Sequence, residues 1–221
     1  VLVVLSLKEF SAFARMQRID RLRAEVVTAR TSADLKAARR SVASIAAIYG
    51  NRADVAWGLS RLREREAEVF DADALLSLAE TELLAPLDRA ALAEVEAAAR
   101  QVATVTAFVP MALADVATAL YSNLRLIRRL SLIYGGRSGS IGNWRLMRRV
   151  FSALLGAGAI ALADDLIGSV TSGGILSKLS RRFGEGVVNG ALTARVGLAA
   201  MELARPMPFV AQPRPSTSAT T

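Results

Sequence analysis

The sequence predicts an all-α protein, a multi-helix bundle, and three observations support this prediction. Hydrophobic residues make up 52% of the 221 residues and aromatic residues only 5%, so Ala, Leu and Val dominate the apolar content. Ala and Leu are strong helix formers, and runs of β-branched residues, which favour strands, are few. Apolar residues recur at three- or four-residue steps, and no segment alternates as a half-buried strand does.

The apolar residues 1–7 are interpreted as the end of a transmembrane helix, since about 20 apolar residues are needed to cross a bilayer. Positive charge directly after a span places that side in the cytoplasm. The basic residues that follow are Lys8, Arg15, Arg18, Arg21 and Arg23. The alternative interpretation is the buried start of a soluble helix. A long amphipathic helix is expected over 7–29 in either case.

Capping residues and helix stops divide the rest of the N-terminal helical region, 8–97, into three helices. Their expected starts are Thr31 with Asp34 in a capping box, then Asn51 or Asp54, then Asp71; their expected ends are Gly50, Ala67 and Pro86.

The second helical region, 98–205, is expected to form the core domain. Its helices are expected over 88–108 with a continuation to Tyr134, then over 143–170, 174–182 and 186–203. Pro110 interrupts the first of them because proline lacks an N–H group, and the stretch from Gly184 to Gly186 is expected to break the last two apart. The tail, 206–221, is rich in Pro, Ser and Thr and is expected to be disordered.

Two long apolar stretches contain acidic residues: 102–121 contains Asp115, and 150–170 contains Asp164 and Asp165. Strong apolar residues contribute about −0.3 to −0.6 kcal/mol each to membrane insertion and a central Asp costs about +3 kcal/mol. The sum is close to zero for the first stretch and unfavourable by about 1–2 kcal/mol for the second. Both are therefore interpreted as core helices whose acids pair with nearby arginines, although a membrane span over 102–121 stays open.

The charge, +8 overall, is unevenly placed. Ten of the 20 acids lie in 64–96, whereas 123–150 contains seven arginines and no acid. These arginines are the candidate partner- or lipid-binding residues: Arg125, Arg128, Arg129, Arg137, Arg145, Arg148 and Arg149. They fit an anionic head-group surface, an acidic protein partner or, third, nucleic acid, for which little binding is expected. Pairing with the acidic region 64–96 is the alternative.

The sequence offers no catalytic machinery. It has no Cys and no His, which excludes disulfides, thiolate chemistry, the usual zinc ligands and imidazole catalysis. The glycine-rich loop 135–142 lacks the Gly-x4-Gly-Lys-Ser/Thr pattern of a phosphate-binding loop. We therefore expect no enzyme activity, no cofactor and no metal.

Five sequence motifs lie at 120–129, 133–135, 184–190, 192–197 and 200–209. Together they resemble an uncharacterised family of proteobacterial inner-membrane proteins, the YcjF type. The resemblance implies a variable N-terminal region, two transmembrane helices and then a cytoplasmic helical part. It also implies that this chain lies at the bacterial inner membrane, on the cytoplasmic side. A similar domain is appended to some GTPases, and the usual genomic companion is a GTPase-like stress protein (YcjX type).

Two functions follow as hypotheses. The first is a non-enzymatic scaffold or regulator that binds a GTPase-like stress protein through its helical surface. The alternative is a lipid-responsive protein whose hydrophobic hairpin, 102–121 and 150–170, inserts into the membrane. The sequence leaves open the partner's identity, the physiological trigger and whether the chain forms a homo-oligomer.

Overall fold

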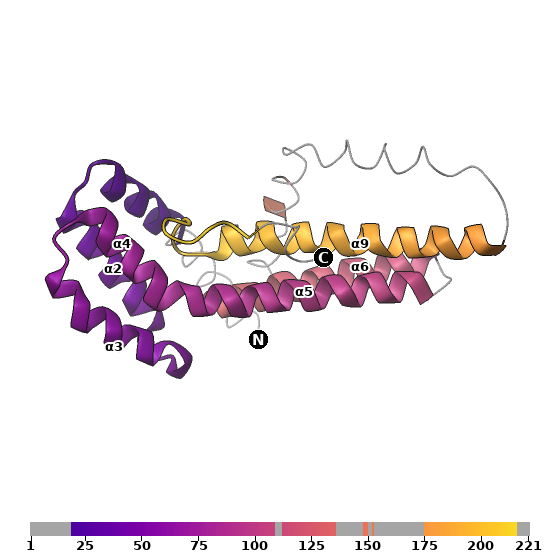
Figure 1. Ribbon diagram of the computed structural model, residues 1–221, viewed down its shortest axis with the longest axis horizontal. Helices are drawn as coiled ribbons and strands as arrows, with labels where there is room; N and C mark the ends of the chain where they lie inside the picture. The colour runs from indigo at the N-terminus through magenta and orange to yellow at the C-terminus, as the bar shows by residue number, and fades with distance from the viewer. Residues whose placement is uncertain (1–18, 109–111, 136–147, 150–151, 153–174, 216–221) are drawn as a thin grey trace, which may run out of the picture. The chain divides into compact units, whose positions relative to one another are not determined.

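A computed structural model of the chain describes residues 19–108, 112–135, 148–149, 152 and 175–215, and all regular secondary structure in these ranges is helical (Figure 1). After a first helix over 19–31, the elements are α2 (Leu35–Tyr49), η1 (Ala53–Val55), α3 (Ala56–Arg65), η2 (Glu66–Glu68), α4 (Ala72–Ala79), η3 (Glu80–Leu84), α5 (Ala85–Phe108), α6 (Ala112–Ile133) and α9 (Ile175–Ala204). The all-α prediction is confirmed. The predicted end of a transmembrane helix, 1–7, and the predicted helix 143–170 lie outside the described residues, apart from 148–149 and 152 of the latter.

The chain divides into two compact units. Unit 1 comprises 1–91, 131–142 and 204–214, and unit 2 comprises 92–130, 143–203 and 215–221, each as far as the structure describes it. The boundary falls inside the long helix α5, so continuous secondary structure does not coincide with a single packing unit.

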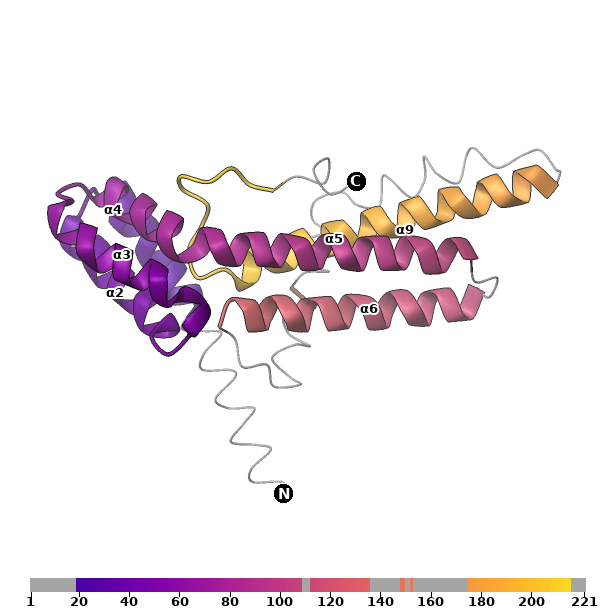
Figure 2. The ribbon, with the colours of Figure 1, turned by 60° about the horizontal axis from the view of Figure 1, so that its bottom comes forward.

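Unit 1 contains α2, α3 and α4, which gather around a core of aliphatic side chains (Figure 2). Aspartates begin two of these helices as expected: the carboxylate of Asp34 accepts a hydrogen bond from the Ala37 N–H at 3.0 Å, and Asp71 accepts one from Ala74 at 2.8 Å. Each cap satisfies one of the free N–H groups at a helix start. The fully buried core residues include Val42, Ile45, Leu62, Leu75, Leu76 and Leu83.

The prediction that Pro86 ends the fourth helix is wrong. The π-helical turn η3 leads from α4 directly into α5, and Pro86 is the second residue of α5. A proline inside an α-helix normally removes one hydrogen bond and clashes with the carbonyl of the preceding turn. In the wider π turn the Ala85 N–H bonds to the Glu80 carbonyl, five residues back. The extra residue relaxes the crowding ahead of the ring, so the chain continues as helix.

Unit 2 contains most of α5, α6 and α9, which lie side by side in both views (Figures 1 and 2). The predicted break at Gly184 to Gly186 is absent, and α9 is one helix of 30 residues. A Cβ atom at Gly186 would lie 2.6 Å from the Ala103 carbonyl oxygen, and one at Gly190 would lie 3.1 Å from the Ala99 carbonyl oxygen. These glycines therefore allow α9 to approach the backbone of α5 closely and do not interrupt the helix.

Within the apolar stretch 102–121 the structure describes parts of two helices, the end of α5 up to Phe108 and the start of α6 from Ala112. Val102 and Thr106 are buried in unit 2. Among the described residues one helical segment, Gly184–Ala204, is long and apolar enough to cross a membrane, and 44% of its most apolar window is buried within the protein.

Candidate functional site

The basic residues predicted on the helix that follows 112 share one side of α6. Arg125, Arg128 and Arg129 are exposed, and we call these three residues the basic face. Leu126, Ile127 and Leu130 lie on the other side of the helix and are buried, with at most 2% of each exposed. The helical period explains this separation, because residues three and four positions apart share a face.

One of the three arginines is already paired. Arg129 donates a hydrogen bond to the Glu94 carboxylate on α5 at 2.5 Å. This contact confirms that part of the basic segment pairs with the acidic region 64–96. Within the described residues no ion pair involves Arg125 or Arg128, so these two positive charges face solvent.

A small groove of about 80 Å³ lies between α5 and α6 beside the basic face. Glu94 lies near Arg129 and Gln101 lies near Tyr121 at the other end, so the two helices run antiparallel here. The Tyr121 side chain is 66% exposed. The groove is lined by Glu94, Ala97, Ala98, Gln101, Tyr121, Ser122, Arg125, Leu126 and Arg129.

The other predicted site residues are only partly described. Arg148 and Arg149 are helical and exposed, and Arg149 takes part in a polar interaction. The backbone of Asp115 belongs to α6, but its side chain lies outside the described part of the structure. Arg137, Arg145, Asp164 and Asp165 lie outside it as well. The pairing predicted for the three acids therefore stays a prediction.

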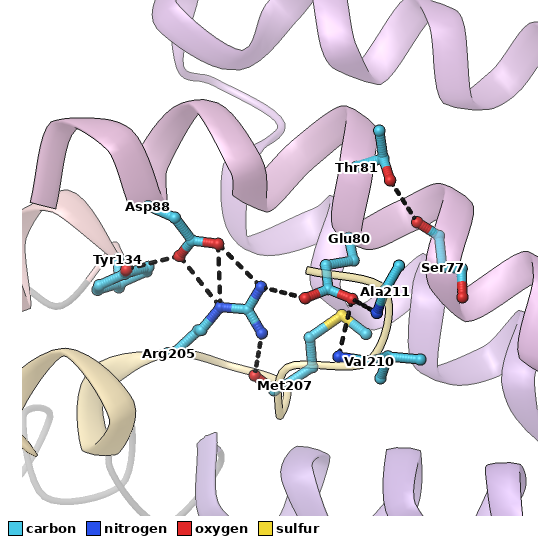
Figure 3. Close-up of polar contacts among 9 residues, drawn as sticks. All are labelled: Ser77, Glu80, Thr81, Asp88, Tyr134, Arg205, Met207, Val210 and Ala211. Atoms are coloured by element: carbon cyan, nitrogen blue, oxygen red, sulfur yellow. Dashed lines mark hydrogen bonds and ion pairs between the residues drawn. The ribbon is translucent and has the colours of Figure 1, made fainter. Parts of the chain in front are cut away.

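A buried ionic cluster that the sequence did not predict lies in unit 1 (Figure 3). It consists of Arg205, Asp88, Glu80 and Tyr134, and we call it the Arg205 cluster. The side chain of Arg205 is 1% exposed, and its guanidinium contacts Asp88 Oδ2 at 2.9 Å and Glu80 Oε1 at 2.7 Å. The Tyr134 hydroxyl donates to Asp88 Oδ1 at 2.7 Å. Three parts of the chain that are distant in the sequence, 80–88, 134 and 205, therefore meet in this cluster.

The π turn helps to place both acids on the same side of the helix. Glu80 and Asp88 are eight residues apart, which corresponds to about 80° of rotation in a regular α-helix with 3.6 residues per turn. A π turn accommodates about one extra residue. The spacing of eight then behaves like about seven, or two full turns, and both carboxylates reach Arg205.

The Arg205 cluster also holds the segment that follows α9. Glu80 Oε2 accepts hydrogen bonds from the backbone N–H groups of Val210 at 2.9 Å and Ala211 at 2.6 Å. The Met207 carbonyl accepts from Arg205, and the Phe209 ring lies 3.9 Å from the guanidinium carbon. The expectation of a disordered tail from residue 206 is therefore wrong for 207–211.

Burial and charge perturb the titration of these groups. Burial raises the pKa of Tyr134 far above its usual value, and the charge of Asp88 raises it further. Burial also raises the pKa of Tyr49, whose hydroxyl points to the Tyr134 carbonyl. For Arg205, burial lowers the pKa, but the hydrogen bonds and charges of Asp88 and Glu80 outweigh it and leave the pKa above its usual value. Arg205 therefore stays charged, and the cluster acts as a structural clamp.

The part of the chain that the structure describes contains no group of three His, Cys, Asp or Glu residues able to hold a metal ion. The sequence signal for the Arg205 cluster was the motif at 200–209, which contains Arg205 but gives no indication that Glu80 and Asp88 are its partners. Among the described residues, the basic face of α6 with its groove is a surface that remains available for binding.

Comparison with known proteins identifies the family. The model described as "Domain of unknown function (DUF697)" matches residues 70–221. A UPF0283 membrane protein of Mesorhizobium japonicum is 44% identical over 214 residues, which cover 97% of this chain and 59% of the relative. One of Rhizobium meliloti is 43% identical over 209 residues (95% and 58%), and one of Brucella ovis is 42% identical over 209 residues (95% and 58%).

The chain thus spans a little under three fifths of the length of these curated relatives, which are named membrane proteins. No solved structure matches it. Since the family model covers the residues from α4 to the C-terminus, including the basic face and the Arg205 cluster, the chain belongs to the DUF697 family.

Proposed function

We propose that this chain is the helical part of a non-enzymatic membrane-associated scaffold or regulator, which binds an acidic segment of a protein partner across the basic face of α6. The observation that supports this proposal is the pair of exposed arginines, Arg125 and Arg128, which form no ion pair among the described residues. Both lie on α6, which forms one wall of the groove, and Arg125 lines the groove itself. The membrane association is supported by the names of the relatives.

A protein partner fits this surface better than a lipid surface does. The groove is lined by the small side chains of Ala97 and Ala98 together with Tyr121 and Arg125, so a side chain of the partner can enter it. Tyr and Arg are also the residue types that most often dominate the energetics of protein interfaces. A bilayer surface would make use of the arginine charges but not of the groove.

The partner we propose, from the resemblance to the YcjF type, is the GTPase-like stress protein of the YcjX type, met at the cytoplasmic face of the bacterial inner membrane. Anionic lipid is the competing ligand. The lipid-responsive hairpin is less well supported, because Val102 and Thr106 are buried in unit 2 and Asn189 on α9 donates a hydrogen bond to Thr106 at 3.3 Å. Insertion of that stretch would have to disrupt the packing of α5 against α9.

A charge-reversal experiment tests the proposal. The variant Arg125→Glu/Arg128→Glu turns two exposed attractions of about 0.5 kcal/mol each into repulsions of similar size, a change of about 2 kcal/mol or about thirtyfold in Kd. Binding of the purified YcjX-type protein is measured by fluorescence anisotropy. The matched control is Arg40→Glu/Arg63→Glu, which changes the net charge equally at two exposed arginines of unit 1.

We expect weaker binding for the α6 variant alone and helical circular dichroism for both variants. Equal affinity for the two variants would remove the basic face from the proposed function. Loss of sedimentation with phosphatidylglycerol vesicles, with the partner's affinity unchanged, would assign the face to lipid.

A further inference from the structure

The central turns of helix α9 are predominantly apolar, with Asn189, Thr193 and Arg195 as their polar residues. From Gly186 to Met201 the only charged residue is Arg195. One side of this stretch packs into unit 2, where Gly190, Ala194 and Gly197 are buried. A helix that is hydrophobic on all sides is normally buried on all sides or lies in a membrane. The side of α9 that does not pack against the other helices of unit 2 is therefore expected to be covered by another apolar surface.

The side of α9 that faces away from α5 is largely uncovered. Val187 is 64% exposed and Leu192 is 42% exposed. The half-buried residues Val188, Ala191, Leu198 and Ala199 belong to the same side. We call these six residues the outer face of α9; the half-buried Arg195 lies between its two halves, 187–192 and 198–199. Exposed apolar surface of this kind marks an interaction site.

We propose that the 187–192 part of the outer face of α9 is the docking site for this chain's own apolar segment 150–163. This inference is independent of the partner proposed above. The first argument is chain continuity: the apolar stretch 150–170 ends four residues before α9 begins at Ile175, and those four residues are Thr, Ser, Gly and Gly. Helices joined by so short a connection pack as antiparallel neighbours.

The second argument is charge complementarity. In an antiparallel hairpin with its turn at 171–174, residues 170 and 175 lie level with each other. The numbers of any two residues that lie level across the hairpin therefore add up to about 345. Asp164 and Asp165 then lie level with the start of α9, which carries Lys178, Arg181 and Arg182 and no acid before Glu185. The uncharged stretch 150–163 lies level with 182–195, which includes the first half of the apolar turns of α9, from Gly186 to Ala194. In this register the acids of one segment face the bases of the other, and the apolar stretches face each other. A register shifted by several turns would lose both matches.

Disulfide trapping tests the docking, and the natural chain has no Cys to interfere. The pair Ala157→Cys/Val188→Cys sums to 345 and should form an intramolecular disulfide under mild oxidation. The matched control is Ala157→Cys/Ala199→Cys. Position 199 lies on the same face of α9 but 11 residues further along, about 17 Å away at 1.5 Å per residue. We expect the first pair to close at least tenfold faster than the control.

Charge swapping supplies a second readout. The changes Asp164→Arg/Asp165→Arg should slow closure of the 157/188 pair, and the added changes Arg181→Glu/Arg182→Glu should restore it, with circular dichroism to verify that each variant is helical. Equal closure rates for the two cysteine pairs overturn the proposal. A 157/188 disulfide formed only between two chains also overturns it and identifies a second copy as the occupant. Failure to close, with the thiol at position 157 shielded from a water-soluble maleimide by phosphatidylglycerol vesicles, assigns the segment to the bilayer instead.

Discussion

Replacement of Arg205 by Met should destabilise unit 1 severely. Methionine keeps much of the side-chain volume but removes the charge that lies between Glu80, which is 0% exposed, and Asp88, which is 9% exposed. Removal of one partner from a buried ion pair costs about 3–5 kcal/mol, because the remaining charge stays buried without compensation. The Met207 carbonyl also loses its donor, and the Phe209 ring loses its cation contact.

A loss of this size is large against the total stability of about 5–15 kcal/mol that is typical of folded domains. It should lower the thermal midpoint by roughly 10 °C or more in a protein of this length. Urea unfolding should be followed by the fluorescence of Trp57, which lies in α3 of unit 1, in a Trp144→Phe background that leaves no other tryptophan. The surface variant Arg128→Ala serves as the control and should change stability by less than about 0.5 kcal/mol.

A rescue variant separates the ionic explanation from simple misfit of the side chain. Arg205→Met/Glu80→Gln/Asp88→Asn removes all three buried charges together and should recover part of the lost stability, since neutral replacement of a whole buried network is often tolerated. A single-variant loss below about 1 kcal/mol would refute the reasoning. A triple variant less stable than Arg205→Met would refute the ionic part of it.

Two further predictions concern helix packing and pH. Gly186→Ala should destabilise the protein by about 1–3 kcal/mol, because its Cβ would press on the Ala103 carbonyl. Gly184→Ala, where a Cβ would have no atom within 4 Å, should be neutral or stabilising by up to about 1 kcal/mol. Thermal unfolding compares the two variants directly, and equal midpoints would contradict the close approach of α9 to α5. Because burial raises the pKa of Tyr49 and Tyr134 in the folded state, the unfolded chain releases these protons first; their contribution to stability is complete below pH of about 10 and is lost as the pH rises above it. Absorbance of tyrosinate at alkaline pH should show two of the three tyrosines ionising only when the protein unfolds, and ionisation of all three in the folded protein would contradict the buried geometry.

The separation of charge from core on α6 was accessible from sequence because it depends on spacing within two helical turns. The same holds for the aspartate caps at Asp34 and Asp71, each of which bonds to a backbone group three residues away. Thr31, predicted to share the first capping box, instead belongs to the end of the preceding helix and donates its hydroxyl to the Val27 carbonyl at 3.1 Å. A capping signal fixes the neighbourhood of a helix start, and neighbouring caps compete within it.

The predictions that were wrong concern residues whose local preference is overruled by packing. Pro86 and the pair Gly184 and Gly186 are helix breakers in isolation. A π turn accommodates the first, and for Gly186 the helix continues because close contact with α5 needs a residue without a side chain. The helix propensity cost of a glycine, about 1 kcal/mol, is small compared with the free energy gained when a whole helix face is buried.

The sequence by itself determined the helical class, the starts of two helices and the basic face, since all of these depend on interactions between residues a few positions apart. Only the tertiary structure decided that Arg205 would meet Glu80, 125 residues away, and Asp88, 117 residues away. An arginine and two acids have many potential partners in a chain with 28 basic and 20 acidic residues. Which of them are buried together is fixed by how the surrounding apolar surfaces pack, because water is excluded only there and an unpaired charge is costly only where water is absent.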